Sequence, residues 1–77
     1  MREKRRLSQY REAKGYSQIE IAEKMSVTQQ SVSSWEVGRT IPKPYQMKQL
    51  SEMLEVSVDE LFYEIFNVNR EEKTNVL

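Results

Sequence analysis

The sequence predicts a small all-α domain, a compact bundle of five short helices. Apolar residues recur at spacings of three and four, as on the buried face of a helix, and no long stretch alternates apolar and polar residues as a strand does. The 77 residues include only two glycines and two prolines, so few positions break a helix. Residues that cap helix N-termini precede three of the apolar patterns, at Ser17, Thr28 and Ser57. Together these observations favour a purely helical fold.

The first helix is predicted over residues 4–14. It ends at Gly15, because glycine readily takes the left-handed conformation that closes a helix. The second helix is predicted over residues 18–24. Ser17 and Glu20 before and within it have the spacing of a capping box, in which each side chain accepts a hydrogen bond from the other residue's backbone N–H.

A three-residue turn at positions 25–27 leads to the third helix, which is predicted over residues 29–37. Thr28 caps its start and Gly38 ends it. Residues 41–44 then form an extended connector, because each of its two prolines disfavours helix in the residue before it.

The fourth helix is predicted over residues 44–54, with Pro44 at its first position, where a missing N–H costs nothing. The fifth is predicted over residues 58–66. Ser57 and Glu60 repeat the spacing of a capping box at its start.

The helical pattern defines one domain, residues 1–66, followed by a polar tail, residues 67–77. The tail lacks apolar periodicity and is expected to be flexible. The core is predicted from the residues that helical spacing turns inward: Leu7, Tyr10, Ile21, Ala22, Met25, Val32, Trp35, Met47, Leu50, Leu54, Val56, Leu61 and Phe62.

The composition argues against several classes of function. The chain has no cysteine and no histidine, which excludes disulfides, thiolate or imidazole metal sites and histidine-based catalysis, so no metal and no cofactor are expected. There is no glycine-rich phosphate loop and no core-facing pair of carboxylates, so an enzyme is not expected. No apolar run approaches a membrane span or a secretory signal, which predicts a cytoplasmic protein with no membrane partner.

The net charge is zero, but the charges are unevenly distributed. Residues 1–16 carry a net charge of +4, residues 17–45 are neutral and residues 46–77 carry −4. A basic end can face nucleic-acid phosphates while the acidic end lies away from them. The asymmetry is equally compatible with an ordinary solvated surface, so charge alone leaves both interpretations open.

Residues 18–37 have the requirements of a helix-turn-helix: two short helices, a three-residue turn, and the small Ala22 where the helices cross. The outward face of the second of these helices has no charged residue. Glutamine can bond bidentately to adenine in the major groove, and threonine can contact the thymine methyl group. This composition favours DNA base reading over the alternative, a polar surface without a ligand. The predicted base-reading residues are Thr28, Gln29, Gln30, Ser33 and Ser34.

Residues 7–62 resemble the Cro/repressor (Xre) type of helix-turn-helix domain, and their third helix is similar to that of lambdoid phage repressors. The resemblance covers about three quarters of the chain and depends on the order and spacing of several short motifs. These are Leu7-x-x-Tyr10-Arg11, Ser17-Gln18, Ile21-Ala22, Thr28-Gln29-Gln30-Ser31-Val32-Ser33, Glu36-x-Gly38-Arg39, Pro42 and Leu54-x-Val56-Ser57-Val58-x-x-Leu61.

The resemblance implies a lambda-repressor-like fold and a role for each matching residue. It makes Gln29 and Gln30 base-reading residues, Thr28 the contact to a thymine methyl group, and Ser34 a further recognition-helix contact. It also implies an ion pair of Arg11 with Glu36, although Arg11 could instead bind a DNA phosphate. The predicted phosphate contacts are Ser17, Gln18, Arg39, Thr40 and Lys43.

Three positions depart from the family pattern. Ser26 and Glu55 occupy turn positions that usually hold glycine, so these turns either accept strain at positive φ or differ in shape. Val37 replaces a common asparagine and removes one expected phosphate contact.

The expected partner is double-stranded DNA, bound by a homodimer at a near-palindromic operator, because one recognition helix reads too few base pairs to select a site. Tyr63, Ile65 and Phe66 are the predicted dimer interface; the alternative is that they pack onto the first helix. The resemblance implies a bacterial or prophage repressor, and no small-molecule ligand is expected. A competing hypothesis is an antitoxin or a protein-binding adaptor built on the same fold.

Overall fold

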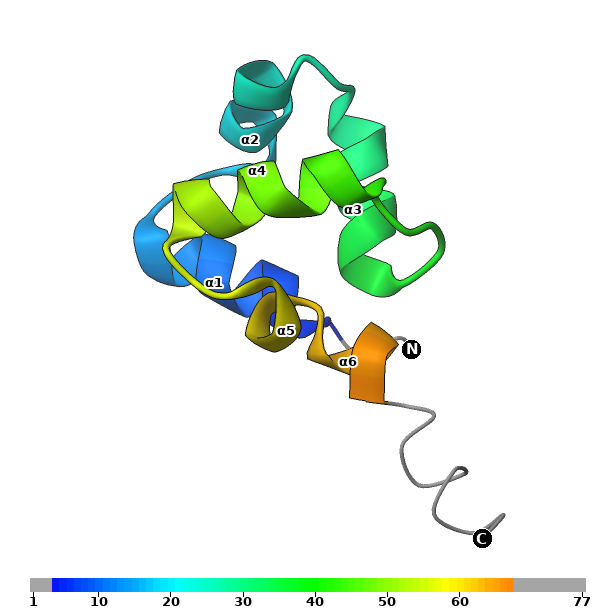
Figure 1. The fold of residues 1–77 in the computed structure, drawn as a ribbon. Helices are drawn as coiled ribbons and strands as arrows, with labels where there is room; N and C mark the ends of the chain where they lie inside the picture. Colours follow the sequence, from blue (N-terminus) through cyan, green and yellow to red (C-terminus); the bar gives the residue numbers. More distant parts are fainter. Residues whose placement is uncertain (1–3, 68–77) are drawn as a thin grey trace, which may run out of the picture.

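A computed structural model describes residues 4–67, and these form an all-helical fold with no strand in that range (Figure 1). The predicted all-α class is therefore confirmed. The described residues contain six helices, α1 (Arg6–Lys14), α2 (Gln18–Met25), α3 (Gln29–Val37), α4 (Pro44–Leu54), α5 (Val58–Leu61) and α6 (Tyr63–Asn67). Apart from Asn67, the predicted polar tail lies outside the described residues.

The helix starts that the sequence indicated most strongly are formed by the expected side chains. The Ser17 hydroxyl accepts the Glu20 N–H at 3.0 Å, and the Glu20 carboxylate accepts the Ser17 N–H at 2.7 Å. The Thr28 hydroxyl likewise accepts the N–H of Ser31 at 3.0 Å. Each side chain satisfies a donor that the first turn of a helix leaves unpaired, which fixes where α2 and α3 begin.

The predicted fifth helix is broken into α5 and α6, and this part of the prediction is wrong. Phe62 leaves helical geometry, with φ −115° and ψ 38°, and is only 3% exposed. The capping box at Ser57 is also incomplete. Its hydroxyl accepts the Glu60 N–H, but the Glu60 carboxylate turns to Arg6 and Tyr10 on α1. Contacts to a distant part of the chain thus replace the local pattern.

The first helix also starts two residues later than predicted. Arg5 precedes α1 in an extended conformation, and its backbone N–H donates to the carbonyl of Glu36 at 3.0 Å. Arg5 is therefore bound to the last turn of α3, and the helix does not continue to residue 4.

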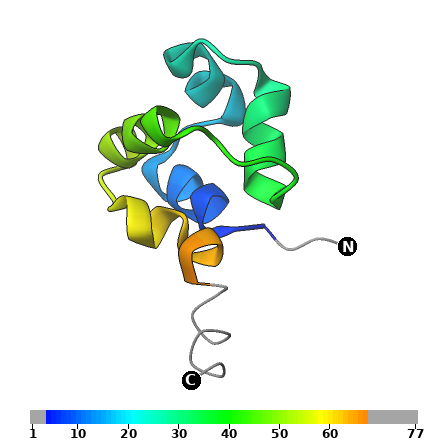
Figure 2. The same ribbon diagram turned by 45° about the vertical axis from the view of Figure 1, so that its right-hand side comes forward.

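The apolar residues of α1 to α5 meet in one core, which contains the predicted residues except Tyr10 and Val56, both partly buried at its edge. Trp35 and Val32 bring the inner face of α3 into this core. In two views α2 and the turn after it lie at one end of the molecule and α5 and α6 lie at the other, while α3 runs from the first end towards the second (Figures 1 and 2). The core therefore fixes α3 from behind and leaves its outer face open.

Two further findings concern residues 4–67. None of their helices is long and apolar enough to cross a membrane. No three of their cysteine, histidine, aspartate or glutamate side chains are grouped in a way that could hold a metal ion.

Candidate nucleic-acid interface

The outer face of α3 carries the five predicted base-reading residues. Thr28, Gln29 and Gln30 are exposed, whereas Ser33 and Ser34 are half-buried. The opposite face is held by α2, whose Ile21 and Ala22 are buried in the core. α3 is therefore a rigidly backed helix that presents amide and hydroxyl groups outward, the geometry of a recognition helix.

A surface hollow of about 320 Å³ lies along one side of this face. It joins three of the predicted base-reading residues to two of the predicted phosphate contacts from the loop after α3. A hollow lined by hydroxyl- and amide-bearing residues and an arginine suits an anionic, hydrogen-bonding partner. The lining residues are Thr28, Gln30, Ser31, Ser34, Arg39 and Thr40.

Ser31 is the one lining residue that the sequence did not indicate as part of the site. The Thr28 hydroxyl donates to the Ser31 hydroxyl at 3.0 Å. Its position could have been predicted from its spacing of three residues from Thr28 and from Ser34, which puts all three on one side of the helix.

The loop after α3 is folded back onto the helix end. Gly38 adopts φ 79°, and the backbone N–H groups of Arg39 and Thr40 donate to the carbonyl of Ser34 at 2.9 Å and 3.4 Å. These bonds satisfy one of the carbonyl groups that a helix end leaves unpaired, that of Ser34. They also fix Arg39 and Thr40, both exposed, beside the recognition face.

A chain of hydrogen bonds runs along the other side of α3. Gln29 donates to the side-chain oxygen of Gln18 at 3.3 Å, and Gln18 donates to the Glu36 carboxylate at 2.8 Å. Arg11 pairs with Glu36, its Nε lying 2.5 Å from Oε2, and also donates to the Tyr16 carbonyl. The Arg11 and Glu36 side chains are 9% and 2% exposed, so Arg11 is occupied inside the protein.

This series of hydrogen bonds holds two of the predicted DNA contacts, Gln18 and Gln29, in fixed orientations. Glu36 fixes the amide of Gln18, because its carboxylate can only accept, and Gln18 in turn fixes which end of Gln29 faces it. Gln29 retains a free carbonyl oxygen and one N–H for a partner.

Comparison with known proteins agrees with this geometry. A helix-turn-helix family model matches residues 2–61. The chain belongs to the helix-turn-helix family. It is similar to the HTH-type transcriptional activator BcrR of Enterococcus faecalis, with 34% identity over 56 residues, which cover 73% of this chain and 28% of that protein. The chain thus matches about a quarter of the relative's length, and no solved structure matches it.

The remaining predicted phosphate contacts of this helix-turn-helix protein lie at helix starts. Ser17 is exposed, but its hydroxyl is engaged in capping α2. Lys43 is exposed before α4, where its backbone N–H donates to the Gln46 side chain at 2.8 Å. Neither residue lines the hollow, so these two are not gathered with Arg39 and Thr40.

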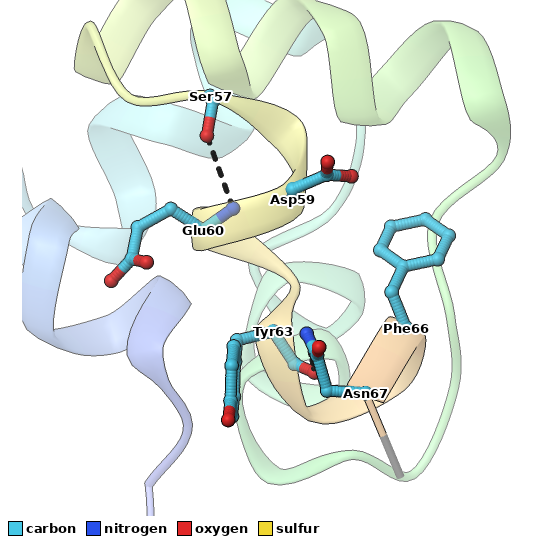
Figure 3. A pocket seen from close by; sticks show the side chains of 6 residues that line it. All are labelled: Ser57, Asp59, Glu60, Tyr63, Phe66 and Asn67. Atoms are coloured by element: carbon cyan, nitrogen blue, oxygen red, sulfur yellow. Dashed lines mark hydrogen bonds between the residues drawn. The ribbon is translucent and has the colours of Figure 1, made fainter. Parts of the chain in front are cut away.

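The three residues of the predicted dimer interface have different surroundings in the helix-turn-helix protein. Ile65 packs against the core. The Arg6 guanidinium lies over the Tyr63 ring, 4.1 Å from its centre, which joins Tyr63 to the start of α1. Tyr63 and Phe66 remain 44% and 47% exposed. They line a second hollow, of about 290 Å³, with Ser57, Asp59, Glu60 and Asn67 (Figure 3).

A cluster around Glu60 connects α5 to α1. The Glu60 carboxylate accepts hydrogen bonds from Tyr10 at 2.6 Å and from Arg6 at 2.5 Å, and in Figure 3 it points away from Phe66. The hydrogen bond from Tyr10 lowers the pKa of Glu60, and the charge of Arg6 lowers it further. The same hydrogen bond raises the pKa of Tyr10, because it favours the protonated phenol.

Proposed function

We propose that the chain binds double-stranded DNA sequence-specifically, with α3 in the major groove, and regulates transcription. One observation carries this proposal: the hollow where base-reading side chains of α3 meet Arg39 and Thr40. Major-groove recognition needs donors and acceptors on a helix that fits the groove, together with groups that bind phosphate beside it. The hollow supports both functions within one continuous surface.

In this proposal Gln29 and Gln30 read bases, and Thr28, Ser33 and Ser34 add shorter contacts. Support comes from the absence of any carboxylate on this face, because a carboxylate would be repelled by the phosphates. Phosphate contacts come from Gln18, whose amide is held in place, and from Arg39 and Thr40. Ser17 and Lys43 add further phosphate contacts at the starts of α2 and α4.

The complex is a homodimer on a near-palindromic operator, and its effect is repression. Two recognition helices one DNA turn apart supply the specificity that a single helix lacks. The exposed Phe66 on α6 supports the dimer. A bound dimer represses by excluding polymerase from an overlapping promoter. The similar protein from Enterococcus faecalis is named an activator, so the sign of regulation needs its own test.

The test begins with in vitro selection of random duplex DNA by the purified protein, followed by affinity measurements on the selected site. Gln29→Ala and Gln30→Ala should each weaken binding about 5- to 150-fold, the range for one bidentate base contact. Gln49→Ala is the control, because Gln49 is an exposed glutamine on α4, away from the hollow. Affinity unchanged in both α3 variants would favour the protein-binding adaptor and refute base reading.

The direction of regulation follows from a reporter whose promoter overlaps the selected site. Repression predicts lower expression when the protein is produced, and recovery with Gln30→Ala. A rise in expression would contradict the proposed repressor and leave the DNA-binding assignment intact.

A further inference from the structure

Arg5 lies against the C-terminal end of the recognition helix. Its backbone N–H donates to the Glu36 carbonyl at 3.0 Å, and Figure 2 shows this start of the chain beside the last turn of α3. A Cβ added to Gly38 would lie 2.5 Å from the Arg5 Cζ and 2.6 Å from Nε and Nη2. The guanidinium therefore lies directly over Gly38, in space that any other residue would fill.

The charge of Arg5 is not compensated within the described part of the chain. Lys4, Arg6, Arg11 and Lys14 each have a carboxylate within 3.5 Å. Arg5 has none within 4.0 Å among residues 4–67, although it lies in the same segment. The negative end of the α3 dipole offers it only a partial countercharge.

Arg39 is the next cation on this loop. It follows Gly38 directly, is exposed, lines the hollow, and has no carboxylate partner within residues 4–67. Gly38 thus has the Arg5 guanidinium over it, and the exposed Arg39 follows it directly in the chain. Two such groups at one end of a recognition helix fit the oxygens of a phosphodiester backbone.

We propose that Arg5 is a further DNA-phosphate contact, working with Arg39 at the C-terminal end of α3. The inference rests on the proposed DNA binding, because a duplex seated on the hollow runs past the Gly38 loop. Gly38 has a double role: it ends α3 at φ 79° and leaves room for the Arg5 side chain. The alternative role for Arg5 is purely structural, as a cation that stabilises the end of α3.

The salt dependence of DNA binding separates these two roles. Affinity is measured by fluorescence anisotropy on the selected duplex between about 50 and 200 mM salt, for the wild type, Arg5→Gln and Arg5→Lys. Each phosphate contact contributes about −0.9 to the slope of log affinity against log salt. Arg5→Gln should flatten the slope by about 0.9 per bound protomer. Between about 50 and 200 mM salt, the fold-loss of affinity per protomer should then be about threefold smaller for the variant than for the wild type. Arg5→Lys should keep the wild-type slope.

Lys14→Gln is the matched control. It removes the same charge from the opposite end of α1, where Lys14 pairs with Glu55 at 2.9 Å. Its slope should equal that of the wild type. Arg5→Met keeps a long unbranched side chain without the charge and gives a second neutral variant should Arg5→Gln unfold. Thermal unfolding of every variant checks the fold.

An unchanged slope in both neutral variants, with or without a change in thermal stability, would overturn the proposal and establish the structural role. Equal flattening by Lys14→Gln would also overturn it, because the effect would then belong to net charge alone. If the wild type binds no selected duplex at any salt concentration, the proposed DNA binding itself fails. The failure of one proposal is thus distinguishable from that of the other.

Discussion

Single residues decide the turns of this fold, and two of them do so at a cost. Ser26 ends α2 at φ 58° and Glu55 ends α4 at φ 59°. The sequence left open whether these turns would be strained or differently shaped; both are left-handed and therefore strained. For a residue with a side chain this conformation costs about 1–2 kcal/mol, because Cβ approaches a carbonyl oxygen.

Ser26→Gly should stabilise the protein, because glycine adopts this conformation without that clash. We expect a gain of about 1 kcal/mol and a rise in Tm of roughly 4–8 °C, measured by thermal unfolding followed by circular dichroism. Ser26→Ala is the control, since it removes the hydroxyl but keeps Cβ. If glycine stabilises the protein no more than alanine does, strain at this turn is not the cause.

Residue-level predictions succeeded where partners lie close in sequence. Ser17 and Glu20 form the predicted capping box because each side chain reaches the other residue's backbone within one turn. The same pattern failed at Glu60, whose carboxylate meets Arg6 and Tyr10, 54 and 50 residues earlier. Arg5 escaped prediction for the same reason, since only the folded chain brings it to Gly38.

Among the elements, the break between α5 and α6 shows how long-range contacts override a local helical pattern. Residues 58–66 have helical periodicity, yet Phe62 turns into the core and the helix stops. Beyond the break, the Arg6 backbone N–H donates to the Glu64 carboxylate at 2.8 Å, and the Arg6 guanidinium covers the Tyr63 ring. These contacts hold α6 against the start of α1. A single straight helix would not direct both Phe62 and Tyr63 to these neighbours.

The Glu60 cluster predicts how this contact between α1 and α5 depends on pH. The pKa of Glu60 is lowered in the folded protein, so its ionised form contributes stability above its ordinary pKa of 4.5. That contribution is lost as the pH falls through the lowered pKa. Tyr10→Phe removes the largest cause of the shift, and the pKa of Glu60 should then rise towards its ordinary value.

Titration of the Glu60 carboxyl carbon by NMR measures this change directly in the wild type and in Tyr10→Phe. Tyr45→Phe is the matched control, because Tyr45 is 58% exposed on α4 and makes no bond to Glu60. A Glu60 pKa that stays the same in Tyr10→Phe would show that the Tyr10 hydroxyl does not stabilise the carboxylate.

At the scale of the whole molecule, the sequence predicted the all-α fold class, the order of the first four helices, and which residues of α3 face away from the core. These depend on periodicity and local caps, which are properties of neighbouring residues. It did not predict that Thr28, Gln30, Arg39 and Thr40 share one hollow, or that Ser17 and Lys43 lie outside it. Such groupings depend on the conformations of the turn before α3 and of the loop after it. The periodicity of apolar residues carries no information about either segment.

The arrangement also separates two surfaces. The turn before α3 lies at one end of the molecule and α6 at the other, so the proposed DNA contacts at the start of α3 are separated from the proposed dimer contact on α6 (Figures 1 and 2). Of the three predicted interface residues, Ile65 packs against the core and Tyr63 is partly covered by Arg6. The proposed dimer contact therefore centres on Phe66.

Phe66→Asp should convert the proposed dimer into a monomer, which size-exclusion chromatography with light scattering measures as a halved mass. The new carboxylate would be buried in an apolar contact, near Asp59 at the same hollow, and both effects oppose association. Tyr45→Asp, at another exposed aromatic residue, should keep the wild-type mass. A mass that Phe66→Asp leaves unchanged would exclude α6 as the contact. With an intact α3, the monomeric variant should still bind a single half-site but lose the gain in affinity that two linked half-sites provide.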